Sequence, residues 1–208
     1  MKKILMAAAF AVAANFAWAY AEMAPDVLAR TVTDEVVAIV RADKELQAGN
    51  PQKVMQLVET KILPHFNFTR MTQLAVGRNW RQATPEQQKI LIDEFKMLLV
   101  RTYTTAFTQY REQQIDYRPL RMAPTDTDVV VKSLIKQPTG QPIAIDYSME
   151  KLGSAWKVYD VKIEGISLVE NYRNTFNNEI SRTGVDGLIR ALNDKNKLLA
   201  AQQATRRP

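Results

Sequence analysis

The sequence predicts an α+β domain in which helices from both ends of the chain wrap a four-stranded antiparallel sheet. Apolar residues recur every three or four positions in the first half, alternate with polar residues over 113–164, and return to helical spacing after Gly165. The first spacing is typical of a helix with one buried face, and the alternation is typical of a strand with one buried face. Because helices and strands fall in separate runs, this order favours an α+β fold over an alternating α/β fold.

The first residues have the layout of a secretory signal peptide. Lys2 and Lys3 precede an unbroken apolar stretch over 4–14, and small residues stand at alternate positions over 17–21. This order of charge, apolar stretch and small residues predicts a cleavable signal peptide over 1–21. A membrane anchor is disfavoured, because a spanning helix needs roughly 20 apolar residues.

Cleavage after Ala19 and cleavage after Ala21 both satisfy the A-x-A rule. The segment 22–193 is long enough for a single domain with its own core, and 194–208 predicts a polar, mobile tail. The chain has no cysteine, so in an oxidising compartment its stability must come from that core and not from disulfide bonds. No later apolar segment approaches the length of a membrane span, and we expect a soluble product.

Helical spacing begins directly after the signal peptide. An amphipathic helix is predicted over 26–48, with Gly49 ending it. Asn50 and Pro51 begin a second helix, because asparagine is a favoured N-cap and proline fits the first turn. Pro64 ends this second helix.

A short helix and a loop are predicted over 65–83, followed by a long helix. The residues 84–87 form a capping box with proline at the first helical position, and the helix extends to about Tyr110. Its apolar stripe is broad, which indicates that it faces a large apolar interior. The stripe consists of Leu91, Ile92, Phe95, Leu98, Leu99, Tyr103, Ala106, Phe107 and Tyr110.

Four strands are predicted where the period changes to two, over 113–122, 127–137, 142–151 and 155–164. Turn-forming residues separate them, and such short connections favour an antiparallel meander. We expect helices to cover one face of this sheet and water to reach part of the other. The third strand alternates most clearly, with Ile143, Ile145, Tyr147 and Met149 on one side.

A second capping box, Ser167 to Glu170, opens a C-terminal helix. Gly184 is expected to end it, and a short helix is expected over 186–192. The apolar side of the first of these helices carries Val169, Tyr172, Phe176 and Ile180.

The sequence lacks the residues that metal sites and most nucleophilic catalysis require. The chain has no cysteine and one histidine, His65. A zinc site needs several His or Cys ligands, and a Ser-His-Asp arrangement would have to use His65 without a G-x-S-x-G turn. No P-loop or G-x-G-x-x-G pattern occurs, so no nucleotide binding is expected. We therefore expect no catalytic residue, no metal and no cofactor.

The charged residues leave one enzymatic alternative open and argue against nucleic acid. In a cone-shaped α+β enzyme an acid in an apolar pocket moves protons, and Asp146, Asp160 and Glu164 are the candidates. The simpler interpretation is that Asp146 and Glu164 are solvated and Asp160 is hydrogen-bonded. The 28 basic residues barely exceed the 22 acidic ones, and no basic stripe is interleaved with aromatic residues, so nucleic-acid binding is not expected.

The segment from Gly153 onward resembles the MlaC (toluene-tolerance) family of periplasmic phospholipid-binding proteins. The resemblance extends upstream and covers about 60–190. In the downstream segment it rests on Trp156, Val158, Asp160, Val161, Ile163, Gly165, Ser167, Leu168, Val169, Asn171, Tyr172, Arg173, Phe176, Ile180, Gly184 and Leu188, and upstream on Pro64, Phe66, Met71, Gly77, Arg78, Trp80, Arg81, Ala83, Thr84, Gln88, Phe95, Leu99, Tyr103 and Tyr110.

This resemblance implies a place in an ABC transport system that moves phospholipid between the outer and inner membranes of Gram-negative bacteria. The implied location is the periplasm, and the implied ligand is a phospholipid. The implied partners are an inner-membrane ABC permease with its periplasmic substrate-receiving component and an outer-membrane lipoprotein complex.

The resemblance also implies an apolar cavity between the sheet and the helices, which takes up the acyl chains and leaves the headgroup at the mouth. Because the chains supply nearly all the binding energy, we expect weak headgroup selectivity. Candidate headgroup contacts are Arg78, Arg81 and Arg173. Candidate wall residues are Phe66, Met71, Leu74, Phe95, Leu98, Leu99, Tyr103, Phe107, Ile143, Ile145, Tyr147, Val158, Val161, Ile163, Leu168, Val169, Tyr172 and Phe176.

Two alternatives to a lipid carrier remain at this point. A small-substrate enzyme on a hollow α+β cone needs a carboxylate or His65 buried in the pocket. A periplasmic adaptor works through its surface and has a solid core. The interior of the domain discriminates among the three.

Overall fold

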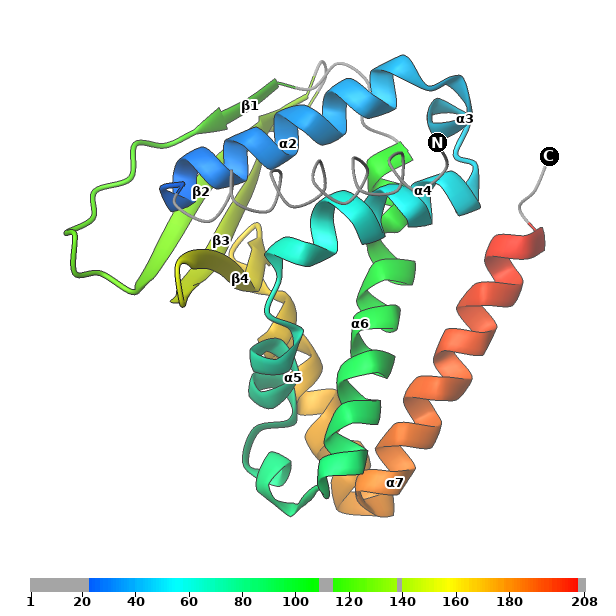
Figure 1. Cartoon of the computed structure of the whole chain (residues 1–208). Coiled ribbons are helices and arrows are strands. Elements are labelled where there is room, and N and C mark those ends of the chain that lie inside the picture. Colours follow the sequence, from blue (N-terminus) through cyan, green and yellow to red (C-terminus); the bar gives the residue numbers. More distant parts are fainter. Residues whose placement is uncertain (1–22, 109–113, 138–139, 206–208) are drawn as a thin grey trace, which may run out of the picture.

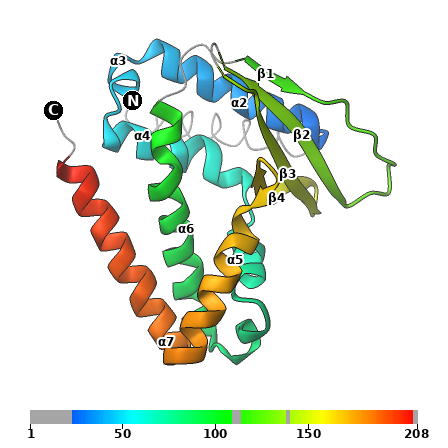
Figure 2. The ribbon, with the colours of Figure 1, turned by 180° about the vertical axis from the view of Figure 1, so that it is seen from behind.

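The computed structural model describes residues 23–108, 114–137 and 140–205. The signal peptide predicted over 1–21, with its cleavage site, lies outside the described residues. The chain is an α+β domain, and Figures 1 and 2 show α5 and the lower parts of α6 and α7 side by side below the sheet. The helices are α2 (Pro25–Ala42), α3 (Lys44–Gln47), α4 (Pro51–Leu57), α5 (Phe68–Val76), α6 (Pro85–Thr108) and α7 (Leu168–Thr205), with a π-helical turn η1 (Val58–Ile62) and 3-10 turns η2 (Leu63–His65) and η3 (Gly77–Gln82).

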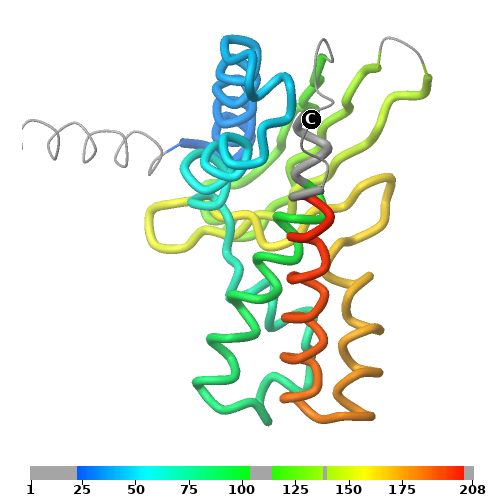
Figure 3. The backbone as a smooth tube through the Cα atoms, turned by 90° about the vertical axis from the view of Figure 1, so that its right-hand side faces the viewer, coloured from blue at the N-terminus to red at the C-terminus, as the bar shows by residue number. Residues whose placement is uncertain are grey.

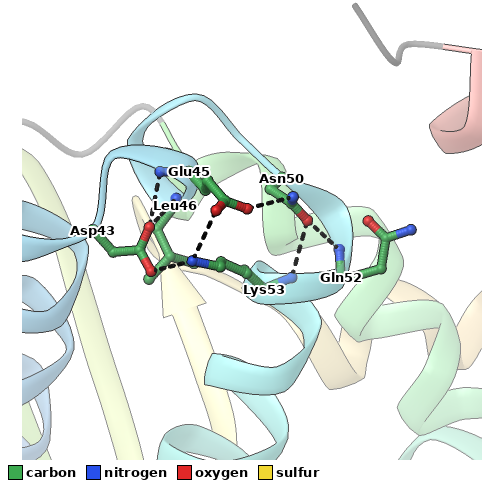
Figure 4. Close-up of polar contacts among 6 residues, drawn as sticks. All are labelled: Asp43, Glu45, Leu46, Asn50, Gln52 and Lys53. Carbon is green, nitrogen blue, oxygen red and sulfur yellow. Dashed lines mark hydrogen bonds and ion pairs between the residues drawn. The ribbon is translucent and has the colours of Figure 1, made fainter.

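The helix predicted over 26–48 is divided in two, because Asp43 interrupts it (Figure 4). Asp43 has extended backbone angles, and its carboxylate accepts the backbone N–H groups of Glu45 and Leu46 at 2.8 and 3.2 Å. An aspartate that bonds to the backbone ahead of it competes with the continuing helix and caps a new one. Asp43 therefore ends α2 and begins α3.

The second capping site of this region confirms the predicted start of α4. The Asn50 side chain accepts the backbone N–H groups of Gln52 and Lys53, and Pro51 occupies the first turn. The Lys53 amine bonds to the Asp43 carboxylate at 2.7 Å, and this bond lowers the pKa of Asp43. The two caps are thus tied to each other at one corner of the molecule (Figure 4).

The sheet has five antiparallel strands in the order β1-β2-β3-β4-β5, so the predicted count of four is wrong. The added strand, β5, folds back onto β4 through Glu164 and Gly165, whose φ angles of 51° and 79° suit a tight hairpin. A strand of two residues is too short to show an alternation of apolar and polar residues, so the sequence pattern does not predict β5. The strands are β1 (Gln114–Tyr117), β2 (Asp128–Lys136), β3 (Ile143–Leu152), β4 (Ala155–Ile163) and β5 (Ile166–Ser167).

The two faces of the sheet differ as predicted. Val131 and Met149 are fully buried on the face that α2 covers, whereas Val130, on the opposite face, is 41% exposed. Figure 3 shows α2 beside the strands in the upper half of the molecule. Strand β1 is shorter than predicted and ends before Pro119, which has no N–H for the ladder.

Polar contacts fix the start of α5 to the sheet. Asn67 caps α5 by accepting the Arg70 N–H, and its amide donates to Glu150 on β3 at 2.7 Å. The Arg70 guanidinium pairs with Glu150 and Asp128, and lies 3.7 Å from the centre of the Tyr159 ring. The first turn of α5 is therefore tied to β2, β3 and β4.

The long element α7 consists of two helical segments that meet at Gly184, whose φ and ψ are 72° and −177°. The second segment continues to Thr205, where a mobile tail over 194–208 was expected. The amide of Asn196, a buried residue, donates to Glu94 on α6 at 2.7 Å, and Gln203 donates to the Arg101 carbonyl at 3.2 Å. Polar side chains make these contacts with α6. The sequence of this segment is therefore as polar as that of a mobile tail, although the segment is helical and packed.

Gly184→Ala is expected to lower the free energy of unfolding by about 1–3 kcal/mol, because the backbone angles at this position are accessible essentially only to glycine. No side chain lies close enough to Gly184 to clash with a methyl group, so the loss measures backbone strain. Urea denaturation gives the value. The exposed neighbour Ser181→Ala is the control, with a change within about 0.5 kcal/mol. Equal stability of both variants contradicts the prediction.

The buried apolar side chains form three clusters. The helical cluster lies among α5, α6 and α7, the N-terminal cluster among α2, α3, α4 and α6, and the sheet cluster between α2 and the strands. Within the described ranges, no helix has both the length and the hydropathy needed to cross a membrane. The helical cluster includes Met71, Leu91, Phe95, Leu98, Leu99, Val169 and Phe176; the N-terminal cluster includes Val36, Val40, Val58 and Val100; the sheet cluster includes Leu28, Val131, Met149 and Val158.

Candidate functional site

A cavity of about 340 Å³ lies where the three clusters meet. Its wall includes Met71 and Leu99 of the helical cluster, Val58 of the N-terminal cluster, and Leu28 and Val158 of the sheet cluster. Most domains have one contiguous core, whereas the centre of this domain is a cavity whose volume falls in the range of ligand sites.

Helix α2 forms one long wall of the cavity with a single face. The lining residues of α2 recur every three or four positions, and they form the apolar face that the spacing over 26–48 predicts. The π-helical turn η1 continues this wall, and turns of this kind occur often at functional sites. The residues contributed by these elements and by η2 are Leu28, Ala29, Val32, Thr33, Val36, Val37, Val40, Val58, Ile62, Leu63 and His65.

The inner face of the sheet forms the opposite wall. Ile145 pairs with Ile163, and Tyr147 pairs with Val161, so neighbouring strands present apolar side chains at the same level. Strand β4 is covered at its free edge by β5 and by Asn67, whose N–H donates to the Val158 carbonyl at 2.8 Å. The sheet residues on the wall are Ile115, Ile135, Ile145, Tyr147, Met149, Val158, Val161 and Ile163.

The few polar groups on the wall are uncharged. Thr33 is hydrogen-bonded to the Tyr117 hydroxyl at 2.7 Å. Burial lowers the pKa of His65 below its ordinary value of 6.5, so the imidazole is neutral at pH 7, and burial raises the pKa of Tyr103. Among the residues that the structure describes, no Asp, Glu, Lys or Arg lines this cavity. The cavity therefore suits the hydrocarbon part of a ligand.

The structure divides the predicted wall residues between the cavity and its surroundings. Leu74 is 36% exposed, Ile143 is half-buried but off the wall, and the side chain of Phe107 lies outside the described residues. Phe95, Leu98, Val169, Tyr172 and Phe176 lie in or against the helical cluster. The residues that do lie on the cavity wall are Phe66, Met71, Leu99, Tyr103, Ile145, Tyr147, Val158, Val161, Ile163 and Leu168.

The sequence reasoning missed the contribution of α2 and η1 to the wall. The helical spacing over 26–48 was recognised, but nothing in one amphipathic pattern tells whether its apolar face meets other side chains or a cavity.

The three arginines considered for the headgroup are exposed and lie off the cavity wall. Arg78 and Arg81 belong to η3, and the guanidinium of Arg173 on α7 lies against Gly77.

The carboxylates considered for catalysis also lie off the wall. Asp160 is buried, and its carboxylate accepts the Val169 N–H at 3.2 Å at the start of α7. The exposed Glu164 accepts the Ala144 N–H. In the part of the chain that the structure describes, no three His, Asp or Glu side chains are grouped as a metal site would require.

A family model described as MlaC protein matches residues 30–194. The chain belongs to the MlaC family. This membership confirms the resemblance found in the sequence. A solved structure of similar fold, a phospholipid-binding protein from Ralstonia solanacearum in complex with a phospholipid, has 48% sequence identity and a TM-score of 0.78, over 83% of this chain and 96% of that one.

Two curated relatives are more distant members of the same group. The intermembrane phospholipid transport system binding protein MlaC of Haemophilus influenzae is 24% identical over 174 residues, which is 82% of this chain and 81% of that protein. The toluene tolerance protein ttg2D of Pseudomonas putida is 25% identical over 167 residues, 80% of this chain and 77% of that protein.

Proposed function

We propose that this MlaC-family protein is a periplasmic phospholipid carrier, which holds the acyl chains in the central cavity and shuttles lipid between the outer and inner membranes. The observation that carries the proposal is the uncharged, apolar wall at the junction of the three clusters. The similar Ralstonia solanacearum protein, which binds a phospholipid, supports the same ligand class.

The physical chemistry of the ligand explains why such a carrier is needed. At about 0.8 kcal/mol per methylene, two chains of about sixteen carbons represent roughly 25 kcal/mol of transfer from water. A free phospholipid therefore does not cross an aqueous compartment at a useful rate. A carrier has to imitate the bilayer interior without greatly exceeding its affinity, because otherwise the lipid could not be unloaded.

The proposal includes location and partners. The signal peptide predicted over 1–21 would deliver the chain to the periplasm. There it would exchange lipid with an outer-membrane lipoprotein complex and with an inner-membrane ABC permease and its periplasmic substrate-receiving component. Residues 23–205 would act as one unit, since α7 contacts α6 as far as Gln203. The arginines Arg78, Arg81 and Arg173 are not part of the proposal.

The two alternatives find less support. The enzyme requires a carboxylate or a reactive His65 in the pocket, but the candidate carboxylates lie off the wall, and burial lowers the pKa of His65. The adaptor requires a filled interior, which does not match a cavity between three clusters.

Protein purified without detergent is expected to carry phospholipid, about one molecule per chain, because the cavity wall offers the chains an environment close to that of a bilayer. Native mass spectrometry and organic extraction measure this stoichiometry. Delipidated protein is expected to take up phospholipid from vesicles. Lipid-free protein that also fails to take up lipid from vesicles contradicts the proposed function.

A further inference from the structure

The cavity ends abruptly along α6. Leu99 and Tyr103 lie on its wall, whereas Phe95 and Leu91, one and two turns before Leu99 on the same side of the helix, do not. All these residues belong to the same apolar stripe. The upper part of the stripe therefore faces the cavity, and the lower part faces other side chains.

The neighbouring helices leave the wall at the same level. On α5, Met71 lies on the wall, and Ala75, one turn later, lies within the helical cluster. On α7, Leu168 lies on the wall, and Tyr172 packs against the helical cluster. Three helices thus change from wall to core together, which gives the cavity a floor.

Close-packed aromatic rings fill the space beneath this floor. The Phe95 ring meets those of Phe176 and Tyr172 edge to face, with ring centres 5.1 and 5.2 Å apart. Phe95 and Phe176 are 0% and 2% exposed. A hydrocarbon chain that reaches the floor cannot continue into this cluster, because protein cores are packed to the density of organic crystals.

We propose that Leu99 and Met71 form the floor that limits the length of the acyl chain this protein accepts. The inference rests on the proposed function and adds chain-length selectivity to it. The chain ends, and not the headgroup, would meet the floor, because a charged headgroup cannot be buried against apolar side chains without a partner. Met71 and Leu99 are 1% and 7% exposed and belong to both the wall and the helical cluster.

Selectivity follows from the methylenes that find no room. A chain longer than the cavity leaves its surplus methylenes in contact with water or forces the site to distort. Each methylene that is left in water shifts the partitioning of the lipid about fourfold away from the protein and toward the bilayer, the equivalent of about 0.8 kcal/mol. The protein would therefore distinguish lipids by chain length.

Leu99→Ala is expected to shift the bound lipids toward longer chains. Alanine removes part of the floor, and the space that it opens is continuous with the cavity, so the ligand can fill it. Delipidated protein is incubated with vesicles that contain equal amounts of phosphatidylglycerol with chains of fourteen, sixteen and eighteen carbons. Mass spectrometry of the extracted lipid is expected to show the ratio of the longest to the middle species rising on the order of tenfold over wild type.

Two further variants make the result specific. Leu99→Phe raises the floor and is expected to shift the ratio toward shorter chains. Leu91→Ala removes the same atoms from the same helix at a position that is 0% exposed and off the wall. It controls for loosening of the helical cluster and is expected to leave the ratio unchanged.

The outcomes separate this inference from the proposed function. Wild-type protein that takes up lipid, with Leu99→Ala and Leu99→Phe giving the wild-type ratio, overturns the floor alone. An equal shift in Leu91→Ala and Leu99→Ala also overturns it, because general loosening then explains the change. Wild-type protein that takes up no lipid at all overturns the proposed function and the floor with it.

Discussion

Val161→Glu is expected to lower the affinity for phospholipid at least about a hundredfold while leaving the protein folded. Val161 lies two residues before the end of β4, pairs with Tyr147 and lines the cavity. A carboxylate there must either lose its hydration beside acyl chains or hold water where the chains would lie, and burying such a charge without a partner costs several kcal/mol. Each 1.4 kcal/mol is a factor of ten in affinity.

The same sheet offers a matched control for this variant. Val130→Glu makes the identical exchange on the opposite face, where Val130 is 41% exposed. Uptake of a fluorescent phospholipid from vesicles measures binding, and circular dichroism shows whether each variant is folded. We expect Val130→Glu to bind like wild type. If folded Val161→Glu binds as tightly as the control, the inner face of the sheet does not contact the ligand.

Local capping signals made the starts of α4, α6 and α7 predictable. The Thr84 hydroxyl accepts the Gln87 N–H at 3.2 Å, and the Gln87 side chain accepts the Thr84 N–H at 2.9 Å, which is the reciprocal pair that the capping box predicts. The Ser167 hydroxyl likewise accepts the Glu170 N–H at 3.0 Å at the start of α7. Such contacts span three residues, so the sequence determines them without knowledge of the fold.

The division of the apolar stripe on α6 was not predictable in this way. Phe95 and Leu99 are one turn apart and share a face, yet one meets aromatic rings and the other meets the cavity. The difference depends on where the first segment of α7, which carries Tyr172 and Phe176, packs against α6, and that is a long-range arrangement. A single sequence shows that the interior is large and apolar but not which part of it is filled.

The interruption of the helix predicted over 26–48 shows that a local contact can also be missed from the sequence. Hydrophobic spacing continues through Leu46, so the pattern predicts one helix, while a single side chain, Asp43, ends α2 by bonding to the following backbone. Local hydrogen bonding here prevails over periodicity.

Removing the lipid is expected to destabilise α2 and η1 far more than the lower helices. The inner face of α2 meets the cavity. Its polar contacts with the rest of the domain include the bond of Thr33 with Tyr117 at 2.7 Å and the ion pair of Glu35 with Lys61 at 3.1 Å. A ligand present at about a hundred times its dissociation constant contributes about 2.7 kcal/mol. Hydrogen exchange of amides over 32–37 is therefore expected to accelerate about a hundredfold in delipidated protein.

The helical cluster provides the internal reference for that experiment. Phe95 and Phe176 are packed by protein side chains alone, so amides around them should keep most of their protection when the lipid is removed. Uniform acceleration across α2 and α6 would mean that the domain opens only as a whole and that the lipid does not substitute for a local part of the core. Selective acceleration in α2 would mean that the acyl chains of the ligand fill the space between the three clusters and complete the core. It would also mean that α2, which covers the cavity, is the element that opens when the lipid leaves.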